Sequence, residues 1–120
     1  MRTFRFLDFQ VYINAKDFHY KIVDIIKTFP REYFYLADQL KRSSLSIVLN
    51  IAEGSAKRSD KDFNRYLENS LGSVNEALAC LDVALSINLI KREKFSELMI
   101  NAESIKKQLG GFSRKLLSSK

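Results

Sequence analysis

The residue types that carry out covalent or metal chemistry are scarce in this 120-residue sequence. His19 is its only histidine and Cys80 its only cysteine, and the Glu-x-x-His pair of di-iron helical bundles is absent. Glu53 and Glu76 could act as an acid pair only if two helices brought them together. No phosphate-cradling glycine loop or nucleophile elbow is present. We therefore predict no catalytic residue, no metal site and no cofactor, which favours a non-enzymatic protein.

Positive charge is the strongest chemical feature of the sequence. The chain has 20 lysines and arginines against 14 acidic residues, a net charge of +6. Residues 91–120 alone hold eight basic and three acidic side chains. Such a bias suits a polyanion such as nucleic acid, or an acidic membrane surface, but a solvated helix face has the same composition. Both interpretations stay open.

The basic segment also has a regular apolar pattern. Between Phe95 and Leu116, apolar side chains recur every three or four residues, as they do on the core face of a helix. Four cations fall on or beside the opposite face, and we take them as candidate contacts to RNA or DNA: Lys106, Lys107, Arg114 and Lys115. A few phosphate contacts per chain predict weak binding that falls as salt rises.

A second polar group lies between residues 31 and 56. Its members recur at helical spacing, about 100° around from the apolar stripe: Gln39, Ser43, Ser46, Asn50 and Glu53. The sequence around Asn50 is so apolar that we expect its amide to be partly buried and hydrogen-bonded. Arg42 is about 16 Å from Glu53 along one helix, too far to pair with it, so we expect both to find partners on another helix or subunit.

The apolar pattern predicts four helices, and the fold class is therefore all-α. We expect helices at residues 7–28, 31–56 and 59–88, with Pro30 ending the first and Ser59 capping the third. The fourth carries the run that ends at Leu116. Gly110 and Gly111 weaken its interior and predict a kink or fraying there.

Helices of similar length joined by short links run antiparallel to their neighbours. We therefore predict one antiparallel up-down-up-down four-helix bundle, a single domain over residues 1–120. The third helix has a second face of small residues, which would meet another helix of the bundle or another subunit: Ser70, Ser73, Ala77, Cys80 and Ala84. One helix turn cannot bury Tyr33, Phe34 and Tyr35 together. Either a partner subunit covers some of them, which we favour, or they form an exposed aromatic surface that could stack on bases.

Two further observations bear on the cellular compartment in which the protein occurs. The lone Cys80 cannot form an intramolecular disulfide, and no run approaches the roughly 20 apolar residues that a membrane span needs. We expect a cytoplasmic protein with no membrane partner.

Specific motifs occur between Phe29-Pro30 and Glu76, notably Gln39-Leu40-x-Arg42 and the NIAEG segment from Asn50 to Gly54. Together they resemble the four helix bundle protein family. This is also called the rRNA intervening-sequence protein family, because some members are encoded in insertions within bacterial large-subunit rRNA genes. The resemblance places the family signature here on Gln39, Arg42, Asn50, Glu53 and Gly54.

What the resemblance implies is an up-down bundle, commonly a homopentamer, with no established enzymatic activity. The sequence is also similar to the accessory protein of diversity-generating retroelements, a basic pentameric bundle associated with nucleic acid and a reverse transcriptase. We therefore predict a non-enzymatic homo-oligomer, pentameric for preference, that binds RNA or DNA weakly through its basic surface. The alternative is a structural or adaptor protein that assembles with a protein partner and has no nucleic-acid ligand, and an enzyme ranks third.

Overall fold

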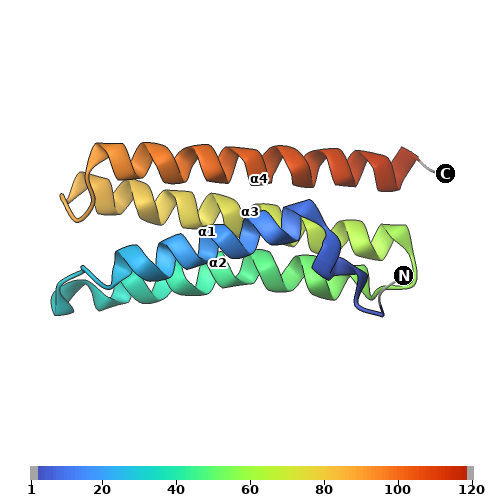
Figure 1. The fold of residues 1–120 in the computed structure, drawn as a ribbon, viewed down its shortest axis with the longest axis horizontal. Coiled ribbons are helices and arrows are strands. Elements are labelled where there is room, and N and C mark those ends of the chain that lie inside the picture. Colours follow the sequence, from blue (N-terminus) through green and yellow to red (C-terminus); the bar gives the residue numbers. More distant parts are fainter. Residues whose placement is uncertain (1–2, 119–120) are drawn as a thin grey trace.

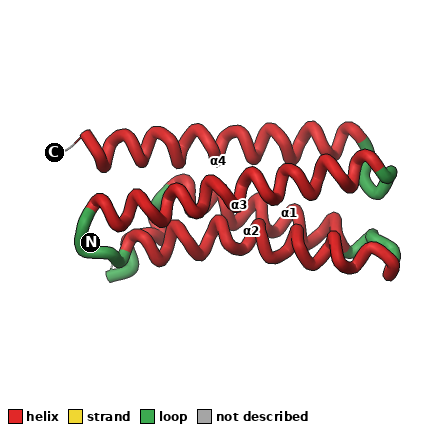
Figure 2. Tube along the Cα trace, turned by 180° about the vertical axis from the view of Figure 1, so that it is seen from behind, coloured by secondary structure: helices red, strands yellow, loops and turns green. Residues whose placement is uncertain are grey.

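A computed structural model describes residues 3–118. It contains four long helices: α1 (Gln10–Ile26), α2 (Phe34–Ser55), α3 (Asp60–Ser86) and α4 (Arg92–Ser118). Each runs antiparallel to the one before it, in a bundle that measures 48 × 23 × 20 Å (Figure 1). The all-α, up-down-up-down fold predicted from the sequence is confirmed. Short loops join the helices, and the described chain begins and ends at the same end of the bundle (Figure 2).

The first two helices begin later than the sequence predicts. A short 3-10 helix precedes each one, η1 (Arg5–Asp8) before α1 and η2 (Arg31–Tyr33) before α2. Phe9 and Pro30 both have extended backbone angles, so the chain turns at these residues and starts a new helical segment. Proline favours this arrangement because it has no N–H to donate to a preceding turn.

Both ends of α3 follow from local side-chain chemistry. The Ser59 hydroxyl accepts a hydrogen bond from the backbone N–H of Asp62 at 3.1 Å, which confirms the predicted cap. At the other end Asn88 has a left-handed φ of 63°, and the N–H of Leu89 donates to the Ala84 carbonyl at 2.9 Å. This geometry satisfies carbonyls at the helix end that would otherwise lack donors.

The kink or fraying predicted at Gly110 and Gly111 is wrong. The α4 helix continues unbroken through both glycines to Ser118. Leu109 is fully buried just before them, and Phe112 packs against the core just after. Tertiary packing on both sides therefore outweighs the weak helix propensity of glycine.

The core receives side chains from all four helices and forms one cluster. The small face of α3 belongs to it, since Ser70, Ala77 and Ala84 have no exposed surface. The Ser70 hydroxyl donates to the Ile47 carbonyl of α2 at 2.8 Å. This face therefore meets a neighbouring helix of the bundle, the first of the two alternatives that the sequence left open. Cys80 is half-buried beside it, and burial together with the charge of Glu76 raises the pKa of its thiol.

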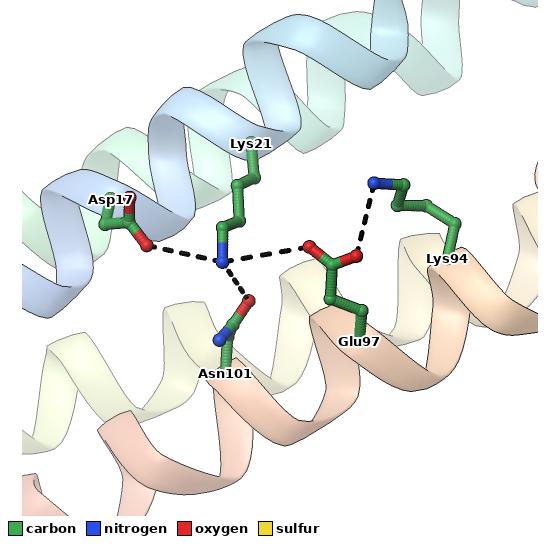
Figure 3. Close-up of polar contacts among 5 residues, drawn as sticks. All are labelled: Asp17, Lys21, Lys94, Glu97 and Asn101. Atoms are coloured by element: carbon green, nitrogen blue, oxygen red, sulfur yellow. Dashed lines mark hydrogen bonds and ion pairs between the residues drawn. The ribbon is translucent and has the colours of Figure 1, made fainter.

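Polar side chains join α1 to α4, the two helices that no loop connects. Figure 3 shows Lys21 of α1 reaching toward α4. Its Nζ lies 3.1 Å from Oδ1 of Asn101, 3.8 Å from a carboxylate oxygen of Glu97 and 3.4 Å from Asp17 on its own helix. One partly exposed cation thus contacts groups from both helices and links α1 to α4.

The aromatic cluster singled out in the sequence is largely uncovered. Phe34 is 58% exposed and Tyr35 66% exposed, while Tyr33 is half-buried. The prediction that one turn cannot bury all three is confirmed. Among residues 3–118, no helix is both long and apolar enough to cross a membrane.

Candidate functional site

The two polar groups found in the sequence lie on different parts of the bundle. One follows the contact between α2 and α3, and the other lies along the second half of α4. We describe the α2 group first because it contains the family signature.

Gln39 and Arg42 make different kinds of contact. The Gln39 amide donates to a carboxylate oxygen of Glu76, which joins α2 to α3. Arg42 instead pairs with Asp38 of its own helix, with 2.9 Å between Nε and Oδ2. Within this chain Arg42 therefore has its partner on its own helix and not on another one, because a carboxylate one turn back on the same face is nearer. A partner on another subunit stays a prediction. Glu53 is exposed, and no partner for it occurs within residues 3–118.

Asn50 is partly buried, as its apolar surroundings predict. Its amide donates to the Ser46 carbonyl at 2.9 Å and to the Ser46 hydroxyl at 3.1 Å. Ser73 of α3 donates to the same hydroxyl at 2.9 Å. Asn50 is thus satisfied within its own helix, and the hydroxyl of Ser46 connects it to α3.

Gly54 is required by packing. A β-carbon at this position would lie 2.7 Å from the β-carbon of Tyr66 and 2.9 Å from the ring of Phe63, both on α3. Only glycine lets the two helices approach this closely. Of the signature residues, Gln39 and Gly54 therefore contact α3 directly, and Asn50 is connected to α3 only through the Ser46 hydroxyl. Arg42 and Glu53 are left on the surface.

The possible acid pair does not form. Gln39 contacts Glu76, and Glu53 lies fourteen residues further along α2, roughly 21 Å along the axis at about 1.5 Å per residue. Within the described chain, no three His, Cys, Asp or Glu side chains gather as a metal site would require.

His19 forms a hydrogen bond between two helices of the bundle. Its Nδ1 lies 2.7 Å from the hydroxyl of Ser44, which is fully buried on α2 and itself donates to the Lys41 carbonyl at 3.2 Å. Burial lowers the pKa of His19 because it disfavours the charged ring. A serine with no exposed surface cannot meet a substrate, so this pair joins α1 to α2.

Three of the four candidate cations share one hollow. Lys106, Lys107 and Arg114 line a trough of about 460 Å³ between α3 and α4, which we call the α3–α4 trough. Its other lining residues are Leu71, Glu103 and Gly110. Lys115 does not line it.

A second group of cations was not predicted from the sequence as a candidate contact surface. Lys57, Arg58 and Lys61 lie in and just after the α2–α3 connection, at the end of the bundle where α4 finishes (Figure 1). All three are exposed. The signal in the sequence is three basic residues within five positions.

Comparison with known proteins identifies the family. A family model described as "23S rRNA-intervening sequence protein" matches residues 7–111. The chain belongs to the 23S rRNA-intervening sequence protein family. A solved structure from Bacteroides thetaiotaomicron, a protein of unknown function from the S23 ribosomal protein family, is 27% identical with a TM-score of 0.81. The match covers 86% of this chain and 97% of that one. No curated protein matches the sequence.

The family match covers one of the two polar groups completely and the other only in part. All of the α2–α3 contact lies within residues 7–111, so the 23S rRNA-intervening sequence protein family resemblance spans the residues that hold these helices together. Lys106 and Lys107 lie inside the match, whereas Arg114 and Lys115 lie beyond it.

Proposed function

We propose that this family member is a non-enzymatic, self-associating cytoplasmic protein that binds RNA or DNA weakly through the cationic surface of α4. The observation that supports the proposal is the convergence of Lys106, Lys107 and Arg114 on one trough. All three are exposed, and cations gathered in a groove attract a phosphate backbone more strongly than the same charges spread over a surface.

A single chain would bind poorly. Glu103 lines the same trough, and Glu68 lines the adjoining hollow, so both lower the local positive charge. If each chain makes about two phosphate contacts, binding falls by roughly 0.7 to 0.9 log units per contact for each tenfold rise in salt. Several copies that present the trough together would raise the affinity through multivalency.

The test is charge reversal at Lys106, Lys107, Arg114 and Lys115, each replaced with Glu. We expect this variant to lose retention of a short RNA at about 50 mM salt, where phosphate contacts are strongest. The matched control reverses four exposed cations at the opposite end of the bundle: Lys27, Arg31, Lys91 and Arg92. Because both variants change the net charge equally, only a localised site predicts that the control still binds. An equal loss of RNA retention in the two variants would contradict the proposal.

Self-association is supported by the outer face of α2. Leu45 and Leu49 are one turn apart and both exposed, and exposed Phe34 and Tyr35 begin the same helix. A second copy that covers such a face would remove it from water. Light scattering should give a multiple of the 13.9 kDa chain, five copies being the number that the resemblance implies. Replacing Leu45 and Leu49 with Lys should reduce the mass to that of a monomer, and an unchanged mass would exclude this face as the contact.

A structural or adaptor protein without a nucleic-acid ligand is the second candidate. The observation in its favour is an apolar groove of about 390 Å³ between α1 and α2, lined in part by Val23, Ile26 and Phe34. If the wild-type protein retains no RNA, single-stranded DNA or duplex DNA at about 50 mM salt, the adaptor function replaces nucleic-acid binding.

A further inference from the structure

Gly110 is a glycine that the fold itself does not require. A β-carbon here would meet only the guanidinium of Arg114, at 3.5 Å, the far end of a flexible side chain. Gly54 differs, because a β-carbon there would collide with α3. Glycine weakens a helix interior relative to alanine. The missing side chain at Gly110 therefore lowers the stability of α4 and relieves no contact within the chain.

Gly110 lines the α3–α4 trough, and the guanidinium of Arg114 lies beside it. A second hollow of about 260 Å³ adjoins it, and both are lined by Leu71, Gly110 and Arg114. Leu67 and Leu109 add apolar surface to the second hollow. The two hollows thus adjoin along Leu71, Gly110 and Arg114, with apolar side chains in one and the lysines in the other, and we call them together the groove.

This combination is suited to a nucleotide with an unpaired base. The cations Lys106, Lys107 and Arg114 offer sites for phosphate, and the aliphatic surface of Leu71 beside Gly110 offers an apolar contact for the face of a base. Glu103 and Glu68 can accept hydrogen bonds from an N–H donor on the edge of a base, and their charge disfavours a phosphate at the same place. In a duplex the base faces are stacked and cannot enter the groove.

We infer that the α3–α4 trough seats one unpaired nucleotide of a single-stranded RNA or DNA, and that Gly110 is the position that lets its base or ribose approach the helix. The inference rests on the proposed nucleic-acid binding and deepens it by naming the single strand as the ligand.

The first experiment separates base recognition from charge. Fluorescence anisotropy would compare decathymidylate with an abasic strand of the same length, which keeps the phosphates and sugars but has no bases. We expect the wild-type protein to bind decathymidylate about fivefold to tenfold more tightly. Equal affinities would overturn the inference, since they would show that the groove contributes only charge.

The second experiment fills the groove. Gly110→Leu should reduce the preference for decathymidylate over the abasic strand. Because the new side chain would also meet the Arg114 guanidinium, the abasic affinity of the same variant measures any change in the phosphate contact. Gly111→Leu is the matched control, because Gly111 lines neither hollow and its β-carbon would come no closer than 3.9 Å to Arg114. Both substitutions improve helix propensity, so both variants should melt at or above the wild-type temperature.

The outcomes separate this inference from the function on which it rests. Full decathymidylate binding by Gly110→Leu, together with loss of binding in the Lys106, Lys107, Arg114 and Lys115 reversal, would refute the nucleotide seat and leave charge-based binding in place. Absence of wild-type binding to either strand would refute both.

Discussion

Gly54 of α2 and Tyr66 of α3 approach so closely that a β-carbon on Gly54 would lie 2.7 Å from that of Tyr66. This contact fixes the distance between the two helices at the end where they connect. Alanine has the better helix propensity, so any loss of stability on Gly54→Ala must come from the collision. We expect Gly54→Ala to lower the free energy of unfolding by about 1–3 kcal/mol, measured by urea denaturation.

Gly72 provides the control for this prediction. It lies on the exposed side of α3, and a β-carbon there would have nothing within 4 Å. Gly72→Ala should therefore raise the free energy of unfolding by about 0.5–1 kcal/mol through helix propensity alone. Destabilisation by both substitutions would show that the contact with Tyr66 is not the cause at Gly54.

The left-handed residue after α3 gives a second prediction. Asn88 has a φ of 63°, a conformation that costs side chains other than glycine and asparagine roughly 1–2 kcal/mol. Asn88→Ala should therefore lower the unfolding free energy by about 1 kcal/mol, and Asn88→Gly should leave it unchanged or raise it slightly. Thermal melts of the two variants check this, and equal melting temperatures would mean that the turn is not strained by a β-carbon.

Lys21 gives a third prediction, about the contact between α1 and α4. Its amine holds Asn101 and Glu97 of α4 together with Asp17 of α1. We expect Lys21→Met to lower the unfolding free energy by about 0.5–1.5 kcal/mol, and less at high salt. Lys94→Met is the control, because Lys94 pairs with Glu97 only within α4 and does not join two helices. A loss for Lys94→Met as large as for Lys21→Met would contradict a specific role for the α1–α4 contact.

The helices were predictable because the spacing of apolar residues directly reflects which side chains are buried. The cap at Ser59 was predictable for a similar reason, since it depends only on residues within one turn. The family signature was recognisable as a motif, but its physical role was not. That Gly54 is needed for close approach to Tyr66 depends on how α2 crosses α3, which no local pattern encodes.

The errors have the same origin. Arg42 has one possible partner on its own helix and others on neighbouring helices, and the sequence does not rank them. The continuity of α4 through Gly110 depends on Phe112 packing against the core. The separation of Lys115 from the other three cations depends on where α3 lies beside α4, which only the assembled bundle determines.

The hydrogen bond between His19 and Ser44 leads to the last prediction, a dependence of stability on pH. Burial lowers the pKa of His19 in the folded protein below its ordinary value of 6.5, so the folded state binds fewer protons than the unfolded state as pH falls through this range. The contribution of His19 to stability is therefore fully present above 6.5 and is lost as pH falls through the folded pKa. Comparing urea denaturation at about pH 7.5 and about pH 5, we expect wild type to lose more stability on acidification than His19→Gln, which cannot titrate. Equal losses would show that carboxylates elsewhere, and not His19, govern acid stability.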